Sequence, residues 1–170
     1  MTLELQAFTY LRHERRCPIV LYERSPRQII HNDRPDVMGV TSARFLIEIE
    51  AKRTFADFAA NAEKRHVTNR PMLLSRWPKQ FYFIVPEKLA ARVLPALPEW
   101  AGLLVSDHRA LPRVARDAPV NHSSRKLTVK QALRIVHLQS NQVWAAELRL
   151  YHARDRFECA SHPPEIEWMI

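Results

Sequence analysis

Glycine is scarce in this chain, with two glycines against twelve prolines among 170 residues. Glycine-rich phosphate-binding loops of the dinucleotide-binding and P-loop kinds need several glycines at fixed spacing, and the sequence contains no such run. Cysteine is equally scarce, because Cys17 and Cys159 are the only two and form no CxxC pair. The sequence therefore argues against a disulfide framework or a zinc–cysteine site and fits a reducing compartment.

Long apolar runs are also lacking. Residues 1–16 carry charges throughout, unlike the apolar region of a signal peptide. A membrane-spanning helix needs about eighteen or more consecutive apolar residues, and no such stretch occurs. We therefore expect a soluble cytoplasmic protein with no membrane partner. The eight histidines show neither HxxxH nor HExxH spacing, which gives a zinc hydrolase no support.

Positive charge is abundant. The formal net charge is +8 and the pI is about 10.0, and such a surplus favours a polyanionic partner, most simply nucleic acid. From His108 to Arg134 there are seven Lys or Arg residues and one acid, Asp117. The length fits one domain. We expect a single domain over residues 1–170, with a basic C-terminal extension from about residue 107.

Hydrophobic periodicity and turn signals predict an α/β fold with a mixed central sheet flanked by helices. In the second half of the chain, the order of a strand, a helix and another strand predicts a parallel pair of strands joined by a crossover helix. The expected strands are 18–22, 37–41, 45–52, 81–85 and 101–106, with an edge strand or loop over 107–120. The expected helices are 2–16, a helix capped by Thr54 and running to 64, 87–94, a helix capped by Thr128, and a separate piece over 141–151. Residues 23–34 and 70–79 are expected to be loops, and the tail from His152 onward is expected to pack loosely or at an interface.

Two of the expected helices have a predicted buried stripe. After Thr54, Asp57 stands at the third position of a capping box, and the helix is expected to cover the apolar face of the strand that contains Glu50. Its stripe consists of Phe55, Phe58, Ala59 and Ala62. For the helix that is expected to begin after Thr128, the predicted buried stripe consists of Val129, Ala132, Leu133 and Val136.

The stretch Arg34–Lys52 predicts a hairpin of two short strands with an unusual second strand. Because strand side chains alternate between faces, Phe45, Ile47, Ile49 and Ala51 form an apolar face. Glu48, Glu50 and Lys52 share the other face, and Asp36 on the partner strand lies near the same end. Carboxylates beside a lysine suit a hard divalent cation. The alternative is that this charged face is simply the solvated side of an antiparallel sheet.

The order of these elements, together with Pro35-Asp36 and Glu50-Ala51-Lys52, resembles the PD-(D/E)xK nuclease superfamily. The segments EIEAKRTFADF, FYFIVPE and PEWAGLLVSD further resemble small bacterial and phage members, and the likeness covers roughly residues 1–120. The resemblance implies a restriction-endonuclease-like core, helix-strand-strand-strand-helix-strand, in a single nuclease-like domain. It also implies a divalent-metal-dependent DNA nuclease in phage or bacterial DNA processing or repair.

The resemblance assigns a role to each motif residue. Asp36, Glu50 and the main-chain carbonyl of Ala51 would hold Mg²⁺ or Mn²⁺, since all are hard oxygen donors. Lys52 would orient the attacking water and offset developing charge, because neighbouring carboxylates favour a charged lysine. Candidate outer-shell acids are Glu48, Glu4 and Glu14, and the helical stripe does not choose between the last two.

DNA is the expected partner, and basic side chains are expected to contact its phosphate backbone. The candidates are Arg76, Arg109, Arg113, Arg116, Arg125, Lys126 and Lys130, and Trp77 beside Arg76 is a candidate for base stacking. Two alternatives stay open: a catalytically silent DNA-binding member of the same fold within a repair or replication assembly, and an unrelated basic protein that binds RNA or another polyanion. Nucleases of this type often pair, so the resemblance also allows a homodimer.

Overall fold

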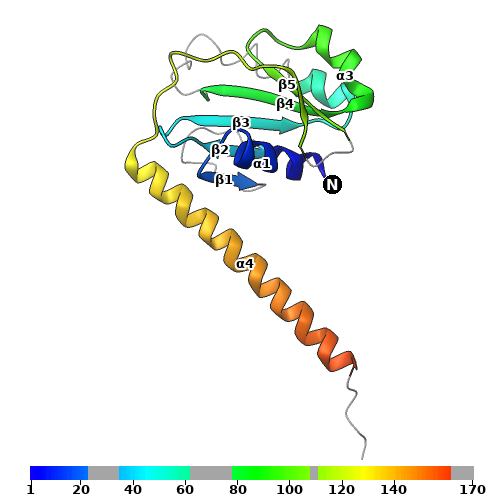
Figure 1. The fold of residues 1–170 in the computed structure, drawn as a ribbon, viewed down its shortest axis with the longest axis vertical. Coiled ribbons are helices and arrows are strands. Elements are labelled where there is room, and N and C mark those ends of the chain that lie inside the picture. Colours follow the sequence, from blue (N-terminus) through cyan, green and yellow to red (C-terminus); the bar gives the residue numbers. More distant parts are fainter. Residues whose placement is uncertain (23–34, 62–77, 108–110, 162–170) are drawn as a thin grey trace, which may run out of the picture.

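The computed structural model describes residues 1–22, 35–61, 78–107 and 111–161. Within these residues, six strands form one sheet in the order β1-β2-β3-β4-β5-β6, with antiparallel pairs at both edges and parallel pairs β3–β4 and β4–β5 in the middle (Figure 1). The strands are β1 Ile19–Tyr22, β2 Val37–Val40, β3 Leu46–Ala51, β4 Gln80–Pro86, β5 Gly102–Ser106 and β6 Arg113–Arg116. The predicted α/β class with a mixed sheet is confirmed, and the basic segment after residue 107 supplies the edge strand β6.

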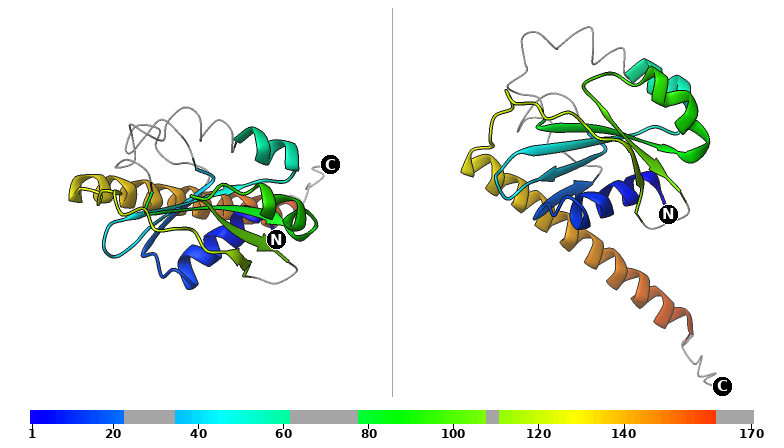
Figure 2. Two further views of the ribbon diagram at one scale, coloured as in Figure 1. Left: turned by 90° about the horizontal axis from the view of Figure 1, so that it is seen from above. Right: turned by 45° about the horizontal axis from the view of Figure 1, so that its top comes forward.

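Helices flank the sheet on both faces (Figure 2). They are α1 Leu3–His13, α3 Glu87–Val93 followed by the short 3₁₀ helix η2 Leu94–Ala96, and α4 Val129–Ser161. A further helix begins at residue 55 and is described as far as residue 61. The predicted caps at Thr54 and Thr128 are confirmed, since each hydroxyl accepts the main-chain N–H three residues on at 3.2 Å. The expected loops at 23–34 and 70–77 lie outside the described residues.

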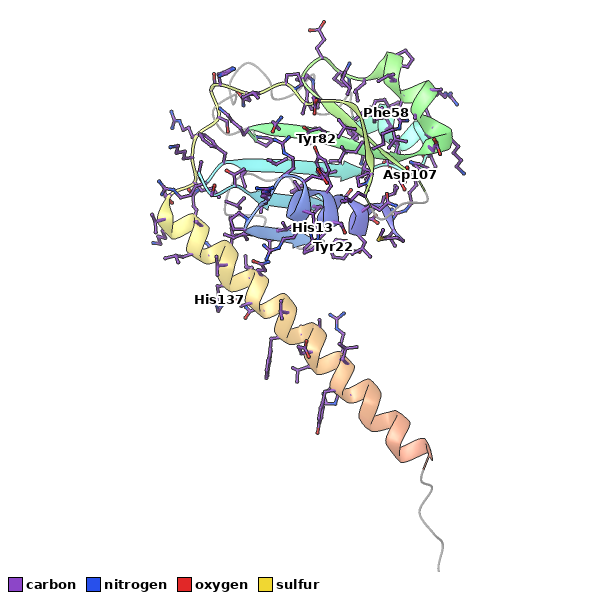
Figure 3. The ribbon with its side chains drawn as sticks, in the orientation of Figure 1. His13, Tyr22, Phe58, Tyr82, Asp107 and His137 are labelled. Carbon is purple, nitrogen blue, oxygen red and sulfur yellow. The ribbon has the colours of Figure 1, made fainter. Side chains whose placement is uncertain are left out.

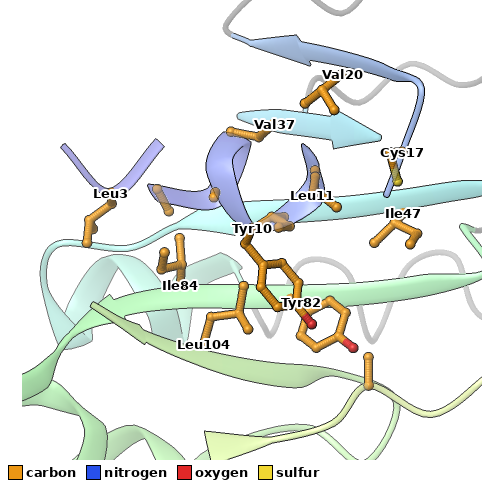
Figure 4. Close-up of a cluster of buried hydrophobic side chains, with 14 residues drawn as sticks. Leu3, Tyr10, Leu11, Cys17, Val20, Val37, Ile47, Tyr82, Ile84 and Leu104 are labelled. Atoms are coloured by element: carbon orange, nitrogen blue, oxygen red, sulfur yellow. The ribbon is translucent and has the colours of Figure 1, made fainter. Parts of the chain in front are cut away.

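One face of the sheet is covered by α1 and is almost wholly apolar (Figure 4). Leu11 and Tyr10 of α1 pack on a layer that includes Ile49 of β3 and Tyr82 of β4. The rings of Tyr10 and Tyr82 meet edge-on, with centroids 5.9 Å apart. This layer joins the N-terminal helix to five neighbouring strands and forms the main core of the fold.

The opposite face carries two apolar clusters. Over β4 and β5, Phe58 of the 55–61 helix packs with Phe83 and Trp100, below α3 and η2 (Figure 3 labels Phe58). Over β1 to β3, Met38 packs with Ile135 of α4. The helix after Thr54 was expected on the apolar face of β3, and this prediction is wrong: Phe58 contacts Phe83, which pairs with Glu50 in the sheet and so shares the acidic face. The predicted stripe residue Ala59 is exposed.

The C-terminal helix differs most from expectation. The predicted separate helix over 141–151 is wrong, because α4 runs unbroken from Val129 to Ser161 and projects away from the sheet (Figure 1). The first part of the expected tail, from His152 to Ser161, belongs to this helix. Its predicted buried stripe is also wrong: Val129 and Leu133 are exposed, whereas Ile135 is fully buried. Of the helices described, none is long and apolar enough to cross a membrane.

Candidate functional site

The acidic face of β3 is buried rather than solvated. Glu48, Glu50 and Lys52 have exposed fractions of 0%, 4% and 6%. In the sheet, Glu48 pairs with Met38 on one side and Phe81 on the other. The two carboxylates therefore lie between the two apolar clusters of this face. The alternative that this strand face is simply solvated is wrong, because burying charges in such surroundings is costly unless they are paired or hold an ion.

Lys52 lies directly beyond the last residue of β3 and is held between two carboxylates. Its Nζ is 3.3 Å from Glu50 Oε2 and 3.7 Å from Asp57 Oδ1. Its main-chain N–H donates to the carbonyl of Ile84 on β4 at 2.9 Å, which continues the parallel pairing. The Asp57 partner is half exposed, so the ammonium group stands where the buried pair meets the surface.

Asp36 lies at the matching end of β2. The β2–β3 register pairs Val37 with Ile49, so one step further Asp36 stands opposite Glu50. Its Oδ2 accepts the Ala51 N–H at 2.8 Å. The structure thus brings Asp36, Glu50, Ala51 and Lys52 together at one edge, as the motif predicts. Asp36 is partly exposed while Glu50 is buried, so solvent reaches this edge from the β2 side.

The structure separates the two candidate acids on α1. Glu4 is buried and forms an ion pair with Arg53, which follows Lys52 in the chain. Its second oxygen, Oε2, is buried and has no hydrogen-bond partner among the described residues. Glu14 is exposed at the opposite end of the helix. Glu4 is therefore the α1 acid that reaches the β3 end, through a contact with Arg53 that the sequence did not reveal.

The candidate DNA-contacting residues fall into different places. Arg76, Trp77 and Arg109 lie outside the described residues. Arg116 is occupied within the fold: its guanidinium donates to the carbonyls of Pro98 and Ala101, and burial lowers its pKa. The remaining candidates, which are exposed, are Arg113, Arg125, Lys126 and Lys130.

Three of these exposed residues gather near the β2–β3 turn. The Leu127 N–H donates to the carbonyl of Arg44 in that turn, which anchors the segment that contains Arg125, Lys126 and Lys130. Lys79 and Lys126 both approach the ring of Phe45, at 4.7 Å and 5.6 Å from its centroid. This basic surface lies at the opposite end of β3 from Glu50, roughly 15 Å away at about 3.3 Å per strand residue.

The donor set at the β3 end fits a small divalent cation in type. Asp36 and Glu50 supply carboxylate oxygens and Ala51 supplies a carbonyl, and Mg²⁺ is commonly held by one or two carboxylates together with waters. Among the described residues, no three His, Cys, Asp or Glu side chains gather as a ready-made metal cage. In this structure, neither Glu48 nor Glu4 therefore joins Asp36 and Glu50 in a cluster of three acidic side chains.

Comparisons with known proteins add a fold but no activity. No protein-family model matches the chain, and no curated protein matches it. The chain is similar to the solved structure of the SPO1766 protein of unknown function from Silicibacter pomeroyi. The TM-score is 0.53 and the sequence identity is 23%, over 99% of this chain and 94% of that chain. At that identity, the likeness shows a shared fold and nothing about chemistry.

Proposed function

We propose that this protein is a divalent-metal-dependent DNA nuclease that hydrolyses phosphodiester bonds. The observation that carries the proposal is the buried Glu50–Lys52 ion pair with Asp36 opposite it across the β2–β3 pair. Buried charges of both signs at a strand end cost stability, and such groups are found most often at sites that use them. The resemblance of Asp36, Glu50 and Lys52 to the PD-(D/E)xK motif supports the same activity.

Asp36, Glu50 and the carbonyl of Ala51 would hold Mg²⁺ or Mn²⁺. When bound, such an ion polarises the scissile phosphate and lowers the pKa of a coordinated water. Asp36 already fixes the edge by accepting the Ala51 N–H, and a carboxylate has further lone pairs for a cation. Glu50 is held in place by its ion pair with Lys52.

Lys52 would act as a positioned positive charge. Held between Glu50 and Asp57, its ammonium group can donate a hydrogen bond to a phosphate oxygen or to the attacking water. A preorganised donor of this kind stabilises charge that develops in the transition state, without reorganisation during the reaction. We therefore assign Lys52 to orientation and charge stabilisation rather than to proton abstraction.

The basic surface of Arg125, Lys126 and Lys130 would hold the DNA backbone at a distance from the cut. Its separation from Glu50 is comparable to the spacing of about four phosphates along one strand of B-DNA, at about 3.4 Å of helix axis per nucleotide. Contacts of this kind position a substrate without reading its bases.

The test is cleavage of supercoiled plasmid and of a single-stranded oligonucleotide with Mg²⁺, with Mn²⁺ and with EDTA. We expect metal-dependent nicking by the wild type, and a loss on the order of 10²–10³ in rate for Lys52→Ala and for Asp36→Ala. Lys88→Ala, which removes an exposed lysine on α3, is the matched control and should cleave normally. Circular dichroism melting checks that each variant is folded.

Two outcomes would contradict the proposal. Cleavage that persists in EDTA, or that survives in folded Lys52→Ala and Asp36→Ala, would place any activity elsewhere. Salt-sensitive DNA binding by a wild type that cleaves neither substrate would instead favour a catalytically silent DNA-binding protein. Preference for RNA over DNA in the same binding assay would favour the basic RNA-binding alternative.

A further inference from the structure

The long helix α4 has two unlike faces. Near its start, Ile135 is fully buried and Leu138 packs beside it, which docks this end of the helix on β1 and its neighbours. At 100° per residue, a second set of apolar side chains lies on the side of the helix turned away from this contact. These side chains are between 40% and 66% exposed: Val129, Leu133, Val136, Val143, Trp144, Leu148, Leu150 and Tyr151. We call this set the α4 stripe.

The outer half of α4 extends beyond the sheet (Figures 1 and 3). Trp144, Leu150 and Tyr151 are about two-thirds exposed there. Helices in proteins owe most of their stability to the packing of an apolar face against other parts of the structure. A helix of 33 residues with such an exposed stripe therefore needs a partner surface.

The spacing of the stripe indicates the shape of that partner. Positions 129, 133, 136, 140, 143, 147 and 150 alternate steps of four and three, the repeat of a helix that packs along another helix. Five of the seven are Val or Leu, and the two polar ones are Ser140 and Glu147. Trp144 and Tyr151 flank this line on one side. The partner is therefore another helix rather than a flat surface.

The stripe also contains a preformed hole. A shallow hollow on α4 is lined by Gln139 and by Ser140, Val143, Trp144 and Glu147. The last four stand at positions i, i+3, i+4 and i+7, which are the four residues that receive one side chain of a facing helix in knobs-into-holes packing. The hollow lies at the middle of the helix, so a partner helix centred there would cover the whole stripe.

Charge favours a second copy of this chain in antiparallel orientation. An in-register parallel pair would place the two Glu147 carboxylates face to face, which is unfavourable. An antiparallel pair centred between Val143 and Trp144 instead sets Ser140 against Glu147 and Val136 against Tyr151. The central part of the stripe then faces the same part of the other copy across a two-fold axis, with Val143 beside Trp144. Further out in this register, Leu133 and Leu150 lie opposite Arg154 and His137 of the other copy. Residues 140–161 contain three arginines and three acids, so this half of the helix does not suit a polyanion.

We propose that the α4 stripe pairs with the same stripe of a second copy, in antiparallel orientation, to form a homodimer. A standard interface buries roughly 800 Å² of each partner, and a single aromatic side chain can supply about 150 Å² or more. Eight large apolar side chains at these exposures reach that order. This proposal rests on α4 alone and is independent of the chemistry at Lys52.

Sedimentation velocity over about 1–100 μM full-length protein tests the pairing. We expect the wild type to be dimeric, and Val143→Glu and Trp144→Glu to weaken the dimer by roughly 100-fold or more, as for central interface residues. Asn141→Glu adds the same charge at an exposed position outside the stripe and should stay dimeric. A wild type that is monomeric throughout, or a dimer that both stripe variants leave intact, would overturn the proposal.

Cysteine cross-linking tests the orientation. Ser140→Cys and Glu147→Cys are each made in a Cys159→Ser background and oxidised alone or after mixing. Antiparallel pairing predicts a covalent dimer only in the mixture, because position 140 faces position 147 of the other copy. Cross-linking of each variant alone, with no gain on mixing, would establish a parallel pair and overturn the antiparallel arrangement.

Discussion

The two faces of β3 are both buried, yet they are made of different chemistry. Ile47, Ile49 and Ala51 lie under α1 in a continuous apolar layer. One residue out of step, Glu48 and Glu50 point to the other face, between two apolar clusters rather than within one. Alternation along a single strand thus places an ordinary core and a buried charged site back to back, a few ångströms apart.

This difference separates what stabilises the fold from what the fold can do. An apolar layer gains free energy from burial, whereas buried charges are often replaceable by apolar side chains with no loss of stability. The α1 face accounts for the architecture, and the acidic face is explained better by chemistry than by stability. Substitutions on the acidic face should therefore lower activity more than stability, and substitutions on the apolar face should lower stability more than activity.

The largest effect is expected from neighbouring residues on opposite faces. Glu50→Gln keeps the size of the side chain but removes its charge, and it should lower the rate of metal-dependent cleavage on the order of 10²–10³. Ile49→Val should leave the rate per folded molecule unchanged and lower the free energy of unfolding by about 1 kcal/mol. Plasmid cleavage and urea unfolding, measured on both variants, give the comparison. Equal loss of activity in the two would contradict the division of faces.

The two glycines test how tightly the apolar face is packed. A Cβ on Gly102 would lie 2.5 Å from the Tyr82 ring and 2.6 Å from the main-chain nitrogen of Ala118. A Cβ on Gly39 would lie 2.9 Å from the sulfur of Cys17, which can shift more easily. Gly102→Ala should therefore cost about 1–3 kcal/mol and Gly39→Ala less, measured by urea unfolding. The reverse order would mean that the surroundings of Tyr82 and Ala118 yield more easily than those of Cys17 and Leu11.

A smaller effect is expected at the basic surface by the β2–β3 turn. Lys126→Ala and Lys130→Ala should each lower the slope of log binding constant against log salt by about one unit, because each removes one phosphate contact. Arg116→Ala should instead lower stability, since its guanidinium holds main-chain carbonyls. Fluorescence anisotropy with a labelled duplex at several salt concentrations measures the slopes. An unchanged slope in both lysine variants would place the DNA elsewhere.

The smallest effect concerns Cys17 under α1. Burial raises the pKa of its thiol to about 11, from an ordinary value of 9.0. The neutral thiol then contributes stability that is present below pH 9 and lost as the pH rises towards 11. In a Cys159→Ser background, thiolate absorbance should appear near pH 11 in the folded protein and near pH 9 in urea. A titration midpoint near pH 9 in the folded protein would mean that the thiol is not buried.

Much of the fold could be predicted because its signals are local. Alternation along the strand predicted β3, the apolar run predicted β4, and the caps predicted at Thr54 and Thr128 accept main-chain hydrogen bonds as expected. The β2–β3 turn was predicted without its usual signal: Arg44 takes a left-handed φ of 66°, where glycine would be the common residue.

The placement of helices could not be read in the same way, because it depends on contacts distant in sequence. The 55–61 helix contains both exposed and buried apolar residues, and only the Phe58–Phe83 contact decides which face of the sheet it covers. On α4, Val129, Leu133 and Val136 have the spacing of a buried stripe, but Ile135 is the residue that docks. Periodicity identifies an apolar face without identifying what covers it.

The candidate site was predicted in part. Pro35-Asp36 and Glu50-Ala51-Lys52 named the residues that the structure brings together, since a hairpin brings its strand ends into register. The ion pairs of Asp57 with Lys52 and of Arg53 with Glu4 were not predicted. These contacts join a strand end to two helices, and no local pattern encodes such a meeting. The choice of Glu4 over Glu14 likewise required the docking of α1.

The most direct test of the central claim is calorimetric titration of the full-length protein with Mn²⁺. We predict one or two bound ions per chain, and loss of that binding in Asp36→Asn and Glu50→Gln. Glu14→Gln, which removes an exposed charge at the far end of α1, should bind Mn²⁺ as the wild type does. Binding that all three variants retain, or a wild type that takes up no Mn²⁺, would contradict a cation site at the end of β3.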